Sequence, residues 1–136
     1  MADNIKLEVV TPEKSVVSED AQIVMAPGTE GEFGVLSGHT PFLTSLNLGT
    51  IHYKNSEGKE AFVFVSGGFA EALPDRVTVL AESAERRRDI DMDRAKEAMK
   101  RAEERLAAGD KDFSMVRAIA ALERSLHRIN LAETRF

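Results

Sequence analysis

The chain has 136 residues, a net charge of −5 and no cysteine, so neither a disulfide framework nor thiol chemistry is available. Its length fits one domain, or two small ones that share an interface. No apolar run approaches the ~20 residues that a membrane span needs, and no apolar signal region follows Met1, so we expect no direct membrane insertion. The acidic front half and the mixed charges of the back half argue against nucleic-acid binding.

Up to about residue 82 the apolar residues alternate with polar ones, which is the period of a β-strand. Ile5, Leu7 and Val9 open this pattern, and residues 61–65 are apolar on both faces, as in a central strand or one covered by a partner. Turn signals separate the apolar runs at positions 11–12, 27–28, 49, 55–58, 67–68 and 74–75. Short strands separated by such turns predict an antiparallel sandwich or barrel.

The segment 27–42, PGTEGEFGVLSGHTPF, is dense in glycine and proline, the residues that shape tight turns. Apolar side chains lie between the turns, together with the carboxylates of Glu30 and Glu32 and the imidazole of His39. This composition indicates a rigid loop displayed for contact. A compact double turn inside the β-domain is the alternative, and the residues alone leave both open.

After residue 85 the apolar residues follow a helical period. One stripe runs from Ala95 through Ala98, Met99 and Ala102 to Leu106, and a second covers residues 113–129. These stripes predict an αα-hairpin whose alanine-rich contact face allows close approach but buries little area, so we expect modest stability. The chain is therefore predicted to be α+β, with a flattened antiparallel β-sandwich in residues 1–84 and a helical hairpin in residues 85–136.

The ends of the two helices are marked by capping residues. Asp91 can cap the start of the first helix, with Ile90 packing back on Ala95 as a hydrophobic staple. Gly109 can take the left-handed conformation that ends this helix, and Asp110 or Asp112 can begin the next.

Two rows of arginines, with the same spacing of seven and then four residues, lie along these predicted helices. The rows are Arg94, Arg101 and Arg105, and Arg117, Arg124 and Arg128. Guanidiniums held close together repel unless an anion lies between them, and phosphate oxygens accept their paired N–H donors well. The alternative is that each arginine pairs with a helix neighbour, such as Glu97 with Arg101 or Asp91 with Arg94. Three consecutive arginines at positions 86–88 add positive charge, and the sequence assigns them no function.

Nothing in the chain forms a catalytic or metal-binding constellation. The three histidines are scattered, without the spacing of metal ligands. Ser66 lacks the G-x-S-x-G frame of a nucleophile elbow, and Gly58-Lys59 is followed by Glu60 rather than by the Ser or Thr of a phosphate-binding loop. We expect no independent catalysis, no metal and no required cofactor.

Several segments, in the same order along the chain, resemble the epsilon subunit of the F-type (bacterial) ATP synthase. They are LEVVTP at 7–12, the loop at 27–42, VSGGFAE at 65–71, DRVTVLAE at 75–82 and IDMDRA at 90–95. Each is a weak signal alone, but the colinear set spans nearly the whole chain. The resemblance implies a flattened sandwich followed by a regulatory helical hairpin.

Some members of that family bind ATP through an I-D-x-x-R-A motif, with a further arginine seven residues on. The resemblance places this motif at Ile90, Asp91, Arg94 and Ala95, followed by Arg101. It also places the family's upstream glutamate and second-helix arginines at Glu85, Arg124 and Arg128. ATP is then a regulatory ligand, with the motif's start reading adenine and the arginines taking the phosphates.

The resemblance also implies a place in the rotor. The sandwich would bind the gamma subunit and rest on the c-ring through Glu30, Gly31, Glu32, Phe33, Gly34 and His39. An extended hairpin would reach the catalytic beta and alpha subunits and inhibit ATP hydrolysis. We expect a peripheral protein at the cytoplasmic face of the bacterial inner membrane. A purely structural adaptor without an ATP site, and a small ATP sensor acting alone, are the rival interpretations.

Overall fold

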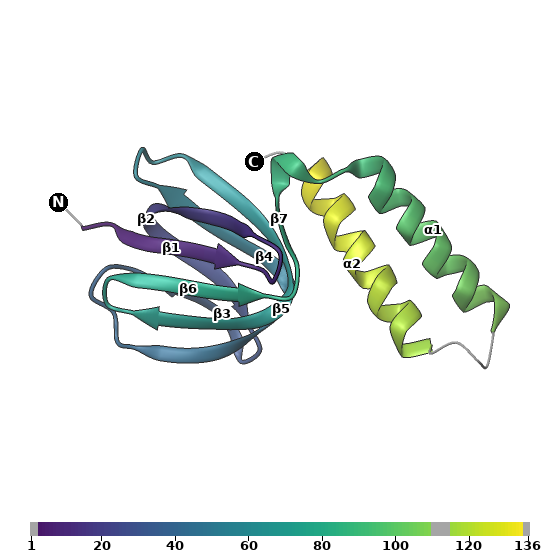
Figure 1. Ribbon diagram of the computed structural model, residues 1–136, viewed down its shortest axis with the longest axis horizontal. Coiled ribbons are helices and arrows are strands. Elements are labelled where there is room, and N and C mark those ends of the chain that lie inside the picture. Colours follow the sequence, from purple (N-terminus) through teal and green to yellow (C-terminus); the bar gives the residue numbers. More distant parts are fainter. Residues whose placement is uncertain (1–2, 110–114, 135–136) are drawn as a thin grey trace. The chain divides into compact units, whose positions relative to one another are not determined.

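The computed structural model describes residues 3–109 and 115–134, and the chain divides into two compact units, Met1–Arg87 and Arg88–Phe136. The first unit is built of strands and the second of helices (Figure 1), which confirms the predicted α+β class. The predicted boundary after residue 84 precedes this division because residues 84–86 form a last strand of the sandwich.

Within the described residues, the first unit contains seven strands that close on themselves. They are β1 (Ile5–Val10), β2 (Ser15–Gly28), β3 (Gly31–Val35), β4 (Phe42–Asn55), β5 (Glu60–Leu73), β6 (Arg76–Ala81) and β7 (Ala84–Arg86). Neighbours follow the order β1-β6-β5-β4-β2-β3, β1 also pairs with β2, and β7 pairs with β5. The β1–β6 pair is parallel and the other pairs are antiparallel, so the predicted antiparallel sandwich holds for all but that one pair.

Two of the predicted turns are corners inside long strands. Gly49 lies within β4, and Gly67 and Gly68 lie within β5, so the prediction of chain reversals at these positions was wrong. Gly67 and Gly68 have φ of 122° and 126°, values that disfavour any residue with a Cβ. They bend β5 where it changes neighbours, because residues 63–65 pair with β7 whereas residues 68–73 pair with β6.

The core of the sandwich is formed by the alternating apolar residues that the sequence predicted. Ile5, Leu7 and Val9 of β1 are fully buried, as are Val77 and Val79 of the parallel β6. Residues 62–65 of β5 are buried on both faces of the strand, as expected from their continuous apolar run. A contiguous core of large side chains therefore specifies the register of this unit.

The second unit is the predicted hairpin of α1 (Met92–Ala108) and α2 (Met115–Glu133), which pack against each other. The Asp91 side chain caps α1 by accepting the backbone N–H of Arg94, and Gly109 ends α1 with φ 60° and ψ 32°. Both caps confirm the sequence prediction. The predicted cap at Asp110 or Asp112 lies outside the described residues, and so does Phe113 of the second stripe.

Small residues dominate the buried face of the hairpin. Ala95 and Ala102 are the buried residues of α1, and α2 buries Ala118 and Ser125 as well as two larger residues near its end. The alanine-rich contact face predicted for α1 is therefore present, whereas Val116, Ile119 and Leu126 of the predicted second stripe are exposed. The modest stability expected of it stays a prediction.

Candidate functional site

The predicted contact loop lies at one end of the sandwich, where backbone bonds join it to other strands. Glu30 occupies the exposed turn between β2 and β3, and Gly31 takes φ 129° at the start of β3. Thr29 donates its N–H to Ser45 O of β4 at 3.0 Å, and Gly38 donates its N–H to Pro74 O at 2.8 Å. The loop is thus tied to β4 and to the β5–β6 turn, and the rigidity expected from the sequence stays a prediction.

Three rings gather within this loop end. The rings of Phe33 and Phe42 meet edge to face with centroids 5.0 Å apart, and the His39 ring lies 5.6 Å from that of Phe42. His39 Nδ1 lies 2.6 Å from the carbonyl oxygen of Thr40, which can only accept, so Nδ1 carries the proton. Among the described residues, the buried Nε2 of His39 has no hydrogen-bond partner.

The structure brings Phe33 and His39 together, while the remaining predicted contact residues line the hairpin beside them. Glu32 and Gly34 are exposed on β3, opposite Pro27 and Met25 of β2. A Cβ added at Gly34 would press on the Met25 sulfur, so the glycine permits close packing there. The double-turn interpretation and the contact-loop interpretation are therefore compatible in one structure.

An exposed apolar surface that the sequence did not single out crosses the outer face of the sandwich. Val10 of β1 pairs with Leu80 of β6, Leu80 pairs with Phe69 of β5, and Phe69 pairs with Ser45 of β4. Leu43 lies two residues from Ser45, hence on the same face of β4. We call Val10, Leu43, Phe69 and Leu80 the apolar row.

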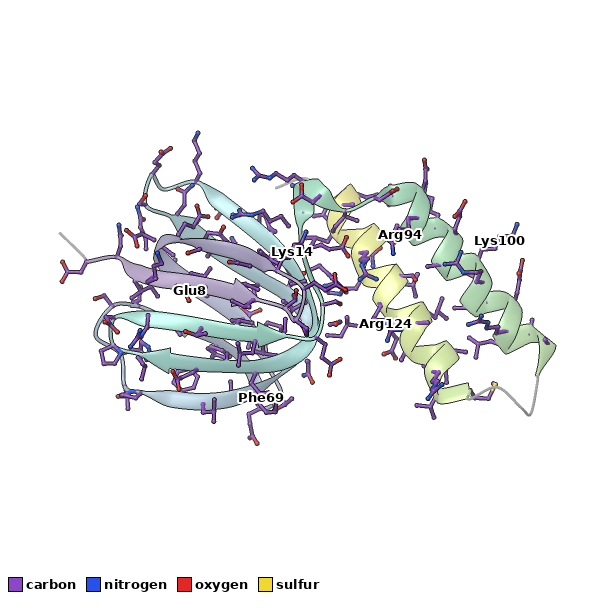
Figure 2. All side chains as sticks on the ribbon, viewed as in Figure 1. Glu8, Lys14, Phe69, Arg94, Lys100 and Arg124 are labelled. Atoms are coloured by element: carbon purple, nitrogen blue, oxygen red, sulfur yellow. The ribbon has the colours of Figure 1, made fainter. Side chains whose placement is uncertain are left out.

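Three residues of the apolar row are open to solvent, with Leu43 70% exposed, Leu80 58% and Phe69 57%, and Val10 is half-buried (Figure 2 labels Phe69). Two residues along the same face, Glu8 of β1 and Glu71 of β5 flank Thr78 of β6, and Leu43 pairs directly with Glu71. Contiguous exposed apolar residues with a polar rim mark an interaction surface. One feature of the sequence could have indicated this surface. The alternation of apolar and polar residues breaks at Gly67–Gly68, so the apolar residues before and after that bend cannot all face the core.

The two arginine rows follow the contact faces of α1 and α2. Each arginine immediately precedes a residue on the inner side of its helix. On α1 the pairs are Arg94–Ala95, Arg101–Ala102 and Arg105–Leu106, and on α2 they are Arg117–Ala118, Arg124–Ser125 and Arg128–Ile129. A helix turns about 100° per residue, so every one of these side chains flanks the contact between the helices.

In an antiparallel pair, the residue preceding the contact position lies on the same side of the seam in both helices. The two rows therefore share one side of the hairpin, the arrangement that the anion hypothesis requires. Figure 2 labels Arg94 on α1 and Arg124 on α2. Arg94 and Arg101 are exposed, whereas Arg124 and Arg128 are half-buried.

Two of the alternative local pairings, Glu97 with Arg101 and Asp91 with Arg94, are not formed. Among the described residues, no ion pair joins Glu97 to Arg101, and Asp91 receives the backbone N–H of Arg94 rather than its guanidinium. Ile90 is half-buried just before α1, and Ala95 is buried within the hairpin. Glu85 lies on β7 of the other unit, opposite Phe64 of β5.

In residues 3–109 and 115–134, no group of three or more acidic or histidine side chains is placed to hold a metal ion. No helix there is long and apolar enough to cross a membrane.

Both units match one known family. Residues 4–87 match the ATP synthase Delta/Epsilon chain, beta-sandwich domain, and residues 88–133 match the ATP synthase Delta/Epsilon chain, long alpha-helix domain. The two matches meet where the structure divides the chain.

Individual relatives carry the same name. The ATP synthase epsilon chain of Desulforapulum autotrophicum is 60% identical over 135 residues, covering 99% of this chain and 100% of the relative. That of Desulfosudis oleivorans is 68% identical over 109 residues, 80% of this chain and 82% of the relative. A chain in the cryo-EM structure of the Euglena gracilis mitochondrial ATP synthase, OSCP/F1/c-ring, shares the fold with a TM-score of 0.76 at 24% identity, over 90% of this chain and 78% of that one. The chain therefore belongs to the epsilon-subunit family of the F-type ATP synthase.

Proposed function

We propose that this chain is the central-stalk subunit that links the gamma subunit to the c-ring of a proton-translocating F-type ATP synthase, with no catalytic activity of its own. The family membership supports this role, as does the likeness to a chain from an assembly whose name includes F1 and the c-ring. The subunit would then be peripheral, at the cytoplasmic face of the bacterial inner membrane.

The apolar row is the observation that carries the rotor assignment. An apolar surface flanked by Glu8 and Glu71 fits a partner with an apolar centre and basic neighbours. We assign this surface to the gamma subunit. Phe69 is the natural anchor, because a large aromatic at the centre of such a patch contributes most to affinity.

The rigid loop end is assigned to the c-ring. Glu30, Gly31, Glu32, Phe33, Gly34 and His39 all belong to this end, and the bonds to β4 and to the β5–β6 turn hold it in a fixed shape. A preformed loop binds without the cost of ordering its backbone.

Binding of purified gamma subunit to the Phe69→Glu variant tests the first of these surfaces. We expect affinity to fall about thirtyfold or more, the effect of losing one anchor residue. The matched control is Leu36→Glu, because Leu36 is 56% exposed against 57% for Phe69 but lies outside the apolar row. If both variants lose the same affinity for gamma, or if neither loses any, the apolar row is not part of the gamma interface.

We assign a regulatory role to the hairpin. Folded on itself it permits turnover, and extended it reaches the catalytic beta and alpha subunits and inhibits ATP hydrolysis. Arg117, Arg124 and Arg128 would then meet acidic groups of the catalytic subunits. In the folded hairpin this row lies on the same side as Arg94 and Arg101. The arginines of both rows would there hold the phosphates of ATP. Two exclusive partners would thus share these guanidiniums.

The free energy that ATP binding could contribute is large enough to switch the hairpin between two states of similar free energy. A ligand that binds only the folded hairpin, at ten times its dissociation constant, stabilises that state by about 1.4 kcal/mol. This shifts a balanced equilibrium about tenfold and leaves a strongly biased one in place. ATP therefore regulates only if the folded and extended states are close in free energy, as the alanine-rich contact face suggests.

Calorimetric titration with ATP, without magnesium, tests the nucleotide site. We expect saturable binding that the Arg94→Ala, Arg101→Ala variant loses. The control variant Lys96→Ala, Lys100→Ala removes the same charge from the same helix, at exposed positions that do not precede a contact residue. Binding that survives in both variants would move the site elsewhere. No binding at millimolar ATP would favour the purely structural adaptor, and a stable monomer that fails to bind gamma would favour the lone ATP sensor.

A further inference from the structure

The last strand of the sandwich has little backbone pairing. β7 has three residues, the short limit for a strand, and pairs only with residues 63–65 of β5 in the part of the chain that the structure describes. At its start, Ser66 donates its N–H to Ser83 O at 3.1 Å, Ser83 donates its N–H to Ser66 Oγ at 3.1 Å, and the two hydroxyls are 2.7 Å apart. Its far end is attached through a side chain.

Arg86 supplies that attachment by reaching two strands with which β7 shares no backbone pairing. Its Nε donates to Val16 O of β2 at 3.1 Å, and its Nη1 donates to the Tyr53 hydroxyl of β4 at 3.1 Å. The same Nη1 lies 3.8 Å from Glu19 Oε1 of β2. The Tyr53 hydroxyl in turn donates to Glu19. One planar guanidinium thus joins β7, β2 and β4.

We propose that Arg86 is a latch that fixes the point at which the chain leaves the sandwich for the hairpin. β7 is followed directly by a 3₁₀ turn, Arg87–Asp89, and then by α1. While Arg86 is bound, the connecting segment begins after β7. When Arg86 is released, β7 peels from β5 and the connection lengthens by the strand's three residues.

The consequences of removing the latch are expected to be local, because the buried hydroxyl of Tyr53 stays paired. Tyr53 is buried and retains Glu19 as acceptor for its hydroxyl, so no buried donor is left unsatisfied when the guanidinium is deleted. Burial, followed by this hydrogen bond, raises the pKa of Tyr53 to about 12, so the phenol stays protonated at neutral pH. Arg86 itself is 22% exposed, which gives it a route to solvent.

Hydrogen exchange of the full chain tests the latch. We expect Arg86→Ala to speed exchange of the β7 amides about tenfold to a hundredfold, the effect of hydrogen bonds to a charged group. Core amides of β4 and β5 outside the β7 pairing should keep their rates. Arg88→Ala, which removes an exposed arginine just after β7, should change neither. Tyr53→Phe, which preserves the core volume, should speed β7 exchange about fivefold.

Two results would overturn the proposal. Unchanged β7 exchange in Arg86→Ala would mean that the strand is held by its backbone. Exchange that rises equally across β4, β5 and β7, or loss of the fold, would make Arg86 a general stabiliser. A longer connection should let the hairpin reach farther, and Arg86→Ala should then inhibit hydrolysis more strongly. This expectation rests on the proposed function. Hydrogen exchange involves neither ATP nor partner subunits, so the two can fail separately.

Discussion

The sandwich and the hairpin are built from different amounts of buried apolar material. The sandwich encloses fully buried large residues such as Ile5, Ile51 and Tyr53, on strands distant in sequence. The hairpin closes over Ala95, Ala102 and its neighbours, side chains that bury little area. The first arrangement fixes one structure, and we expect the second to open at small cost. Unequal burial is what the proposed fixed adaptor with a movable regulator requires.

The largest effect is expected where the sandwich depends on a glycine corner. An alanine at Gly68 would place its Cβ against the backbone carbonyl of Leu80 at φ 126°, so we expect Gly68→Ala to lower the free energy of unfolding by about 3 kcal/mol or more. Urea denaturation of the sandwich signal measures it. Gly38→Ala is the control, because φ is 84° with open space around it, and about 1–2 kcal/mol is expected. Equal losses would show that the β5 corner tolerates a side chain.

The next effect separates the two units directly. Ala118 is 1% exposed in the hairpin, so Ala118→Leu should overpack it and destabilise the helices by about 1–3 kcal/mol. The sandwich should keep its stability, because its core is its own. Helical circular dichroism and hydrogen exchange of β4 and β5 report on the two units. The exposed Ala107 provides the control Ala107→Leu. Joint unfolding of both units in Ala118→Leu would contradict their independence.

High pH should weaken the sandwich through Tyr53. The ordinary tyrosine pKa is 10.0, and burial with the hydrogen bond to Glu19 raises the pKa of Tyr53 to about 12. The folded state therefore holds the proton more tightly, and this contribution is complete below pH 10 and lost as pH rises toward 12. Denaturation at about pH 9 and about pH 11.5 measures it. Tyr53→Phe should show a shallower decline, and an identical decline would exclude Tyr53 as its source.

Low pH should weaken the hairpin by a smaller amount through His127 of α2. Burial lowers the pKa of His127 below its usual 6.5, so protonation is easier in the unfolded chain. Stability from this group is present above that value and is lost as pH falls through the folded pKa. Thermal melts of the helical signal on both sides of pH 6.5 check the direction. In His127→Gln the pH dependence of the melting temperature should be smaller. A larger pH dependence would contradict the assignment to His127.

The features that could be predicted from the sequence are local ones. Asp91 and Gly109 were found because a cap acts within one helical turn. The inner face of β1 could also be identified, because alternation of apolar and polar residues is a local pattern within one strand. The parallel β1–β6 pairing could not be found, since nothing within either strand names a partner so distant in sequence.

The surfaces that depend on register escaped sequence reasoning. Phe69 and Leu80 become neighbours only through strand pairing, and Arg86 meets Tyr53 only after β7 folds onto β5. Gly67–Gly68 was interpreted as a turn because positive φ serves equally for a reversal and for a bend within a strand. The arginine rows were visible from their spacing, but their placement on one side of the hairpin needed the contact residues of both helices.

The most direct test of a fixed adaptor carrying a movable regulator is ATP hydrolysis by the reconstituted complex, with the full chain and with a chain ending after Arg87. The shortened chain should bind gamma with unchanged affinity, because the apolar row lies entirely in the sandwich. Hydrolysis should rise when residues 88–136 are absent. Unchanged hydrolysis with gamma bound would contradict regulation by the hairpin, and loss of gamma binding would contradict the assignment of that surface to the sandwich.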